Sequence, residues 1–256
     1  MLAALTGAGV AVLGGLIGLG GAEFRLPLLI ALFGFVALEA VIVNKAISLV
    51  VVASALLFRL HAVPAEELLA NWPIAANLLA GSLAGAWCGA TWATKAPPQT
   101  LHRWMAVLLL GIAVALLLNH SLPTDGAPGL DGPARWVAGM AAGFGIGVVA
   151  SLLGVAGGEL LIPTIVLLFG TDIKLAGSLS LAVSLPTMVV GIARYSRDGS
   201  FRVLSARRSF VAAMATGSMI GALIGAALLG VVPSGFLLPL LAAVLVVSAW
   251  KIWRHA

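Results

Sequence analysis

The chain has 256 residues, of which 61% are hydrophobic and 9% are charged, and its formal net charge is +5. About a quarter of the residues of a typical soluble protein are charged, so this composition excludes a soluble globular domain and predicts an outer surface that faces lipid. The basic residues fall in short loops, where they report membrane orientation and not nucleic-acid binding. The single cysteine, Cys88, excludes a disulfide within the chain.

Long apolar segments follow one another along the chain, and strand signals are weak, so we predict membrane helices and not a barrel. The segments of the first half cover residues 2–19, 26–36, 40–58, 73–93 and 104–118. Those of the second half cover residues 136–154, 160–170, 173–193, 209–230 and 236–253. The first segment is predicted to be a retained helix and not a cleaved signal peptide. The second segment of each half is shorter than the roughly 20 residues that a span needs, so it either re-enters or forms part of a broken helix.

The second half repeats the first at a constant offset. Glu23 and Pro27 align without a gap with Glu159 and Pro163, since 159 − 23 and 163 − 27 both equal 136. Small residues keep the same register, as in Gly81-Ser82 with Gly217-Ser218 and Gly85-Ala86 with Gly221-Ala222. The ordered set predicts two transmembrane repeats, 1–118 and 136–256, joined by a Pro-, Gly- and Asp-rich solvated linker at 119–135.

Equivalent loops of the two halves have opposite basic bias. The loop after the third segment is charge-balanced in the first half and arginine-rich in the second, where it holds Arg194, Arg197, Arg202, Arg207 and Arg208. The loop after the fourth segment is basic only in the first half, with Lys95, His102 and Arg103. By the positive-inside rule, these loops lie on opposite sides of the membrane. The pattern predicts an inverted repeat with both termini in the cytoplasm and the linker outside.

A Gly-rich break with a following proline occurs once in each half. The first runs from Gly18 through Gly20 and Gly21 to Pro27, and the second from Gly154 through Gly157 and Gly158 to Pro163. Broken helix at membrane depth is tolerated only where it is buried in protein or lines a cavity. Its free N–H groups, at the positive end of a helix, favour an anion. Paired breaks indicate a transport site, although close helix packing through glycine is the alternative.

Polar side chains in the third segments are the next candidates for binding an anion. Asn44 and Ser48 lie on one helix face, and Ser180 and Ser184 occupy the equivalent positions of the second half. Hydroxyls and amides there would replace the water around an anion, or would join neighbouring helices by hydrogen bonds. Lys45 is the cation of this group, and its alternative role is to reach the headgroups by snorkelling.

Acidic residues flank both breaks. Glu23 and Glu159 are interpreted in two ways: they carry a coupling proton, or they stabilise the N-terminus of the helix that follows each break. Arg25 lies beside Glu23. No spacing of His, Asp or Glu typical of a metal site, no nucleophile elbow and no ATP-binding motif occurs. The sequence therefore predicts a secondary transporter that needs no cofactor and is not an enzyme.

The motif Gly-x-Gly-Gly with Pro six residues after its last glycine, together with its counterpart in the second half, resembles the paired signatures of the sulfite exporter TauE/SafE family. Asn44-Lys45 followed by Ser48 resembles the family's first half as well. Ala22 and Ala156 replace glycines of the family's common triple glycine. The resemblance covers nearly the whole chain, and it implies a multi-pass carrier of the bacterial inner membrane. Its substrate would be sulfite, a sulfonate or a related anion, moved by alternating access.

A drug or metabolite exporter with the same plan of five plus five segments is the alternative function. That class does not require the two breaks or the short second segments. The expected partners are a small anion and the lipid bilayer, with no nucleic acid. The sequence is compatible with a homodimer and does not decide the oligomeric state, the exact anion, the direction of transport or the coupling ion.

Overall fold

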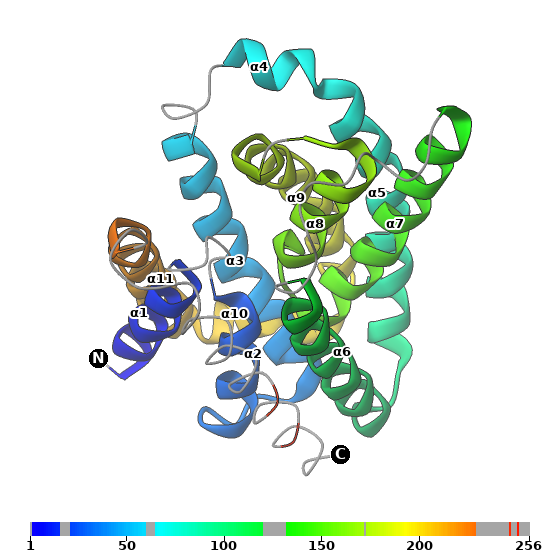
Figure 1. The fold of residues 1–256 in the computed structure, drawn as a ribbon. Coiled ribbons are helices and arrows are strands. Elements are labelled where there is room, and N and C mark those ends of the chain that lie inside the picture. Colours follow the sequence, from blue (N-terminus) through cyan, green and yellow to red (C-terminus); the bar gives the residue numbers. More distant parts are fainter. Residues whose placement is uncertain are drawn as a thin grey trace.

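The computed structural model describes residues 2–15, 21–59, 65–119, 132–171 and 173–228, together with Val246 and Trp250. This part of the chain is mostly helical, with short turns between the helices, and it contains no strand (Figure 1). The longer helices are α1 (Leu2–Gly15), α2 (Ala22–Ala31), α3 (Ala37–Arg59), α5 (Trp72–Lys95), α6 (Pro98–Asn119), α7 (Gly132–Leu153), α8 (Gly158–Phe169), α9 (Ile173–Tyr195) and α11 (Arg208–Leu228). Short helices in the connections are α4 (Ala65–Ala70), η1 (Gly199–Arg202) and α10 (Val203–Ala206).

The structure confirms an all-α integral membrane protein. Among the described residues, five stretches are long and apolar enough to cross a bilayer: Ala37–Leu56, Trp72–Lys95, Gly132–Leu153, Leu175–Tyr195 and Arg208–Gly225. The two short second segments are present as α2, with 10 residues, and α8, with 12 residues. At a rise of about 1.5 Å per residue they reach only about half-way through the hydrocarbon core.

Several helix boundaries differ from the sequence prediction. Helix α2 begins at Ala22 and not near residue 26, because Gly21 in the left-handed conformation starts the helix before Pro27. Helix α6 begins at Pro98, so the basic stretch with His102 and Arg103 forms its first turns. Helix α7 begins at Gly132, inside the predicted linker. The predicted tenth segment, 236–253, lies outside the described residues except for Val246 and Trp250.

The two halves repeat one another in backbone geometry. The bounds of α3 and α9 differ by 136 residues at both ends. Positive φ angles occur at Gly21 and Gly157, and again at the equivalent pair Gly34 and Gly170. These equalities support the internal repeat predicted from the sequence.

Helices of one half pair closely with helices of the other. Helix α5 packs along α7, and its counterpart α11 packs along α1 (Figure 1). Small residues make both contacts possible, since a Cβ at Gly85 would strike the Phe144 carbonyl and one at Gly221 would strike the Ala8 carbonyl. The partners Phe144 and Ala8 are themselves 136 residues apart, so the same small-residue packing is used twice.

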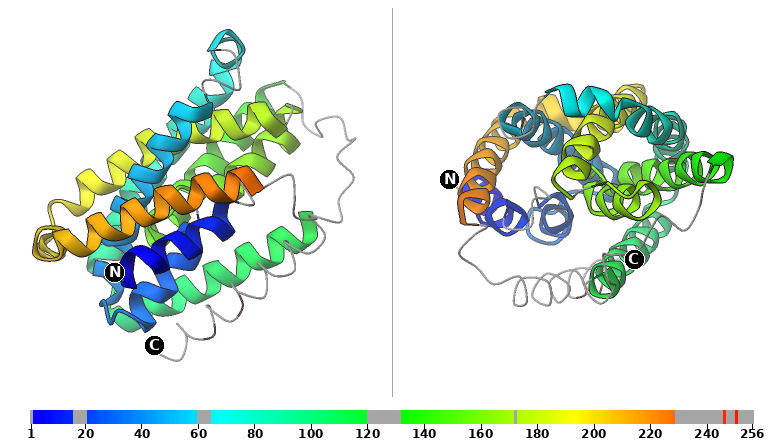
Figure 2. Two further views of the ribbon diagram at one scale, coloured as in Figure 1. Left: turned by 90° about the vertical axis from the view of Figure 1, so that its left-hand side faces the viewer. Right: turned by 45° about the horizontal axis from the view of Figure 1, so that its top comes forward.

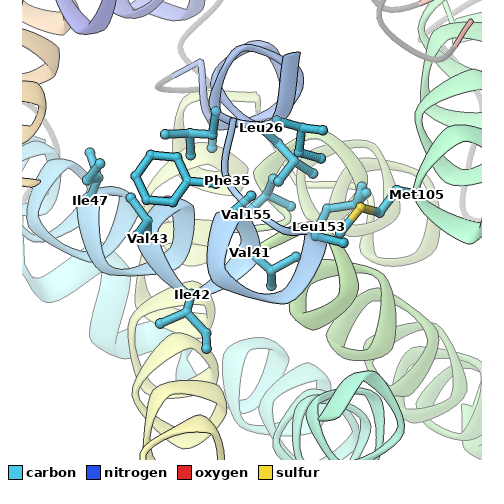
Figure 3. Close-up of a cluster of buried hydrophobic side chains, with 14 of the residues drawn as sticks. Leu26, Phe35, Val41, Ile42, Val43, Ile47, Met105, Leu153 and Val155 are labelled. Carbon is cyan, nitrogen blue, oxygen red and sulfur yellow. The ribbon is translucent and has the colours of Figure 1, made fainter. Parts of the chain in front are cut away.

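The central helix α3 lies inside this arrangement and is surrounded by apolar side chains. Figure 3 shows Val41, Ile42 and Ile47 of α3 among Leu26 of α2 and Leu153 at the end of α7. All five side chains are buried. This apolar cluster is therefore built around α3.

The basic segments of the two halves gather at one end of the helices. Arg194 Nε, at the end of α9, donates a hydrogen bond of 2.7 Å to Thr91 Oγ1, in the last turns of α5. The guanidinium groups of Arg194 and Arg197 both lie over the Trp87 ring of α5. The connection that carries α4 lies at the opposite end of the helices (Figures 1 and 2). This partition of the ends is the one that the positive-inside argument requires.

Candidate functional site

Both breaks face the central helix α3. Gly21 and Gly157 precede α2 and α8 with φ angles of 72° and 82°, a left-handed conformation that glycine adopts without steric cost. Gly154, where the second break begins, lies directly against the Val41 carbonyl of α3. The first break is held on the same helix through Asn44. The two breaks thus approach each other across one buried helix.

Asn44 joins the two breaks directly. Its Nδ2 donates to the carbonyl of Ala22, in the first turn of α2, and to the carbonyl of Leu153, the last residue of α7. Both distances are 3.0 Å, and the side chain is fully buried. The amide thus provides a donor to the Leu153 carbonyl, which the end of α7 leaves without a helical partner, and it adds a second hydrogen bond to the Ala22 carbonyl of α2.

Arg25 is the largest fully buried side chain of the site, and the sequence interpretation did not include it among the binding residues. Its Nε donates to Asn44 Oδ1 at 2.8 Å, and its two terminal nitrogens donate to Ser48 Oγ at 2.6 Å and Ser218 Oγ at 3.0 Å. All of these partners are neutral. The available signal was an arginine two residues before a proline at the start of an apolar run, since a charge at membrane depth is costly and usually functional.

Lys45 is buried completely and does not snorkel. Its Nζ donates to the Ala150 carbonyl at 3.1 Å and to Ser151 Oγ at 3.4 Å, both on α7. The end of the side chain lies over Gly191 of α9, where an added Cβ would come within 2.5 Å of Cε. An ammonium has three donors, so one of them has no partner among these contacts. Lys45 therefore bridges α3, α7 and α9 without a carboxylate.

The predicted serines lie around the same helices but have different roles. Ser48 Oγ donates to the Asn44 carbonyl at 2.7 Å while it accepts from Arg25. Ser184 of α9 donates to the Ala156 carbonyl in the second break at 2.8 Å. Ser180 donates to Gly177 of its own helix at 2.8 Å, and so makes no link to either break.

Glu23 and Glu159 lie in the first turns of α2 and α8 and are buried, with 2% and 7% of their surfaces exposed. The Glu159 carboxyl faces the Glu23 carboxyl. None of the four oxygens meets a hydrogen-bond donor at suitable distance and angle. Among the described residues no group of three or more His, Cys, Asp or Glu side chains could hold a metal ion.

Comparison with known proteins shows the family of this chain. The family model of the sulfite exporter TauE/SafE matches residues 3–253, nearly the whole chain. The chain belongs to the sulfite exporter TauE/SafE family. No curated protein and no solved structure matches it. Membership of a transporter family, together with the apolar helices, makes this chain a multi-pass membrane transport protein.

Two glycines of the TauE/SafE breaks have a packing role in this structure. A Cβ at Gly21 would come within 2.5 Å of the Val10 carbonyl on α1, and one at Gly157 within 3.1 Å of Ile146. The alternative of close helix packing therefore accounts for Gly21. Gly158 forms the first residue of α8, while Gly20 lies outside the described residues. The binding role predicted for these glycines stays a prediction.

Proposed function

We propose that this TauE/SafE protein is a secondary transporter that exports sulfite or a related small sulfur-containing anion by alternating access. The observation that carries the proposal is the burial of two cations, Arg25 and Lys45, whose hydrogen-bond partners are all neutral. A buried cation is costly unless an anion accompanies it. A small oxyanion, with acceptors on every side, suits a guanidinium and an ammonium well.

The surrounding groups support an anion over a neutral or cationic substrate. Asn44, Ser48 and Ser218 hold the guanidinium from three sides and offer side chains that an oxyanion can reach by exchanging partners. The Lys45 ammonium has three N–H donors, of which the Ala150 carbonyl and Ser151 Oγ accept two, so the third can bind an anion. Gly21, Gly157, Gly158, Ser180 and Ser184 complete the proposed site from the two breaks and α9, and Gly20 belongs to the first break by sequence.

The doubled geometry supports alternating access. In inverted-repeat transporters, substrate lies near the midplane between repeats, and one half moves against the other around it. Here the first break belongs to residues 1–118, the second to 136–256, and Asn44 holds both. We place both termini in the cytoplasm and the protein in the bacterial inner membrane.

The test is flux in proteoliposomes that contain the purified protein. We expect labelled sulfite to move faster than in protein-free vesicles, while a labelled neutral amine drug does not. Movement of the drug without sulfite would favour the alternative, a drug or metabolite carrier. Movement of neither would refute the proposed substrate class.

A further inference from the structure

The two buried carboxyl groups next to the breaks are not used in the proposed function. Glu23 and Glu159 come from equivalent positions of the two halves, and they face each other with 2% and 7% of their surfaces exposed. Each lies four residues before a proline, Pro27 or Pro163. Proline has no N–H, so the backbone carbonyls of both glutamates also lack their usual helical donor. The site has acceptors in excess and no donor that meets them.

Two ionised carboxylates cannot occupy such a place without compensation. Removing one charge from water costs several kcal/mol, and a neighbouring like charge adds to the cost. A single proton lowers both costs. It halves the charge of the pair, and the protonated carboxyl can donate a hydrogen bond to the other carboxylate. Pairs of this kind titrate as a unit and not as two separate residues.

The elements packed against α2 and α8 carry the titratable residues that could face the pair. Helix α1 has no titratable side chain, and Arg25 lies on α2 itself and attracts Glu23. The titratable residues on the other elements packed against α2 and α8 are Glu39, Lys45 and Arg59 of α3, His102 and Arg103 of α6, Arg135 of α7, and Lys174, Arg194 and Tyr195 of α9. Among the cations whose side chains the structure describes, Arg25 and Lys45 are the fully buried ones.

We propose that Glu23 and Glu159 form a shared site for one exchangeable proton, and that this proton is linked to the anion; the inference rests on the proposed transport function. The charge balance shows the linkage. With both carboxylates ionised, the buried charges of Glu23, Glu159, Arg25 and Lys45 sum to zero. With one proton on the pair they sum to +1, which a monoanion neutralises. Proton and anion therefore favour each other's binding, and by reciprocity each raises the affinity for the other.

Infrared difference spectroscopy during a pH titration tests the shared proton without any transport. We expect the carbonyl stretch of a protonated carboxylic acid at neutral pH in the wild type and in Glu67→Gln, an exposed control. We expect its loss in Glu159→Gln or Glu23→Gln. Absence of the band from the wild type, or its persistence in both variants, overturns the proposal.

Flux measurements test the linkage. We expect an imposed pH gradient to drive accumulation of labelled sulfite by the wild type, above the passive uptake of protein-free vesicles. In Glu159→Gln we expect accumulation to be lost while exchange of labelled for unlabelled sulfite continues, which also shows that the variant is folded. Accumulation that persists in this variant, or that follows a Na⁺ gradient instead, overturns the proposal.

The two proposals fail in different ways. If the wild type moves no sulfite, the proposed substrate is wrong, and the infrared band alone decides whether the pair holds a proton. If neither Gln variant folds, wild-type vesicles still decide the linkage: equal accumulation with and without a pH gradient contradicts it.

Discussion

Arg25 Nε donates a hydrogen bond of 2.8 Å to Asn44 Oδ1, and both side chains are fully buried. The contact joins α2 to α3 at the first break, while the amide of the same asparagine holds the carbonyl of Leu153 at the second. The guanidinium that we propose as a substrate-binding group is thereby positioned by Asn44, which contacts both breaks.

Asn44→Ala removes this connection. We expect it to lower the free energy of unfolding by about 1–3 kcal/mol, because the Leu153 carbonyl and one guanidinium N–H of Arg25 lose their partner. Thermal unfolding in detergent measures the effect. Ser54→Ala is the control, since this hydroxyl of the same helix bonds only its own backbone at an exposed position. Equal stability of the two variants would show that Asn44 does not hold the breaks.

Gly191→Ala tests the position of the Lys45 ammonium without changing its charge. The new Cβ would come within 2.5 Å of Lys45 Cε and 3.0 Å of Nζ, so the flexible end of the lysine must move. We expect a several-fold higher KM for sulfite with little change in thermal stability. Gly145→Ala, where an added Cβ has open space, should behave as the wild type. An unchanged KM in Gly191→Ala would show that the position of the Lys45 ammonium does not matter for sulfite binding.

The doubled helix packing predicts equivalent effects in the two halves. Gly85→Ala and Gly221→Ala each place a methyl against the carbonyl of a neighbouring helix. We expect each to destabilise the protein by about 1–3 kcal/mol, the usual cost of overpacking. Thermal unfolding against Gly111→Ala on α6, where an added Cβ meets nothing within 4 Å, measures the difference. Stability equal to that of the control in either variant would contradict close packing of that pair.

Cysteine labelling tests the inverted topology. Cys88 is exposed, so the experiment uses a Cys88→Ser background. In intact cells, we expect a membrane-impermeant reagent to label Thr124→Cys in the linker and not Ser205→Cys in the basic segment. Lysis should make Ser205→Cys reactive, which is its positive control. The reverse pattern would refute cytoplasmic placement of the arginines.

The architecture could be predicted from the sequence because its causes are local. Apolar run lengths predict the helices, and the Gly and Pro positions predict the breaks before α2 and α8. The burial of Lys45 was one of two open interpretations, because its segment position alone does not distinguish snorkelling from a site between helices. The structure decides between them, since α7 and α9 enclose the ammonium.

The partners of Arg25 could not be predicted in the same way. Ser218 lies 193 residues away and reaches Arg25 only because α11 packs along α1 and beside α3. The capping role considered for Glu23 and Glu159 is plausible from sequence, since acids favour helix N-termini. Both acids lie in the first turns of α2 and α8, as this role requires. The sequence could not show that the two carboxyl groups also face each other, because they are 136 residues apart and meet only when the two breaks come together.

The central claim is that buried cations between the two breaks bind the transported anion, and Lys45 tests it most directly. The measurement is uptake of labelled sulfite at subsaturating concentration in proteoliposomes with wild type, Lys45→Arg or Lys45→Ala. Loss of a charged hydrogen bond predicts a decrease of about ten- to a hundredfold for Lys45→Ala. Lys45→Arg should keep part of the activity, because it keeps the positive charge. Activity should fall below that of the wild type, because a guanidinium differs from an ammonium in shape and donor geometry. Wild-type uptake by a correctly folded Lys45→Ala variant would contradict the account.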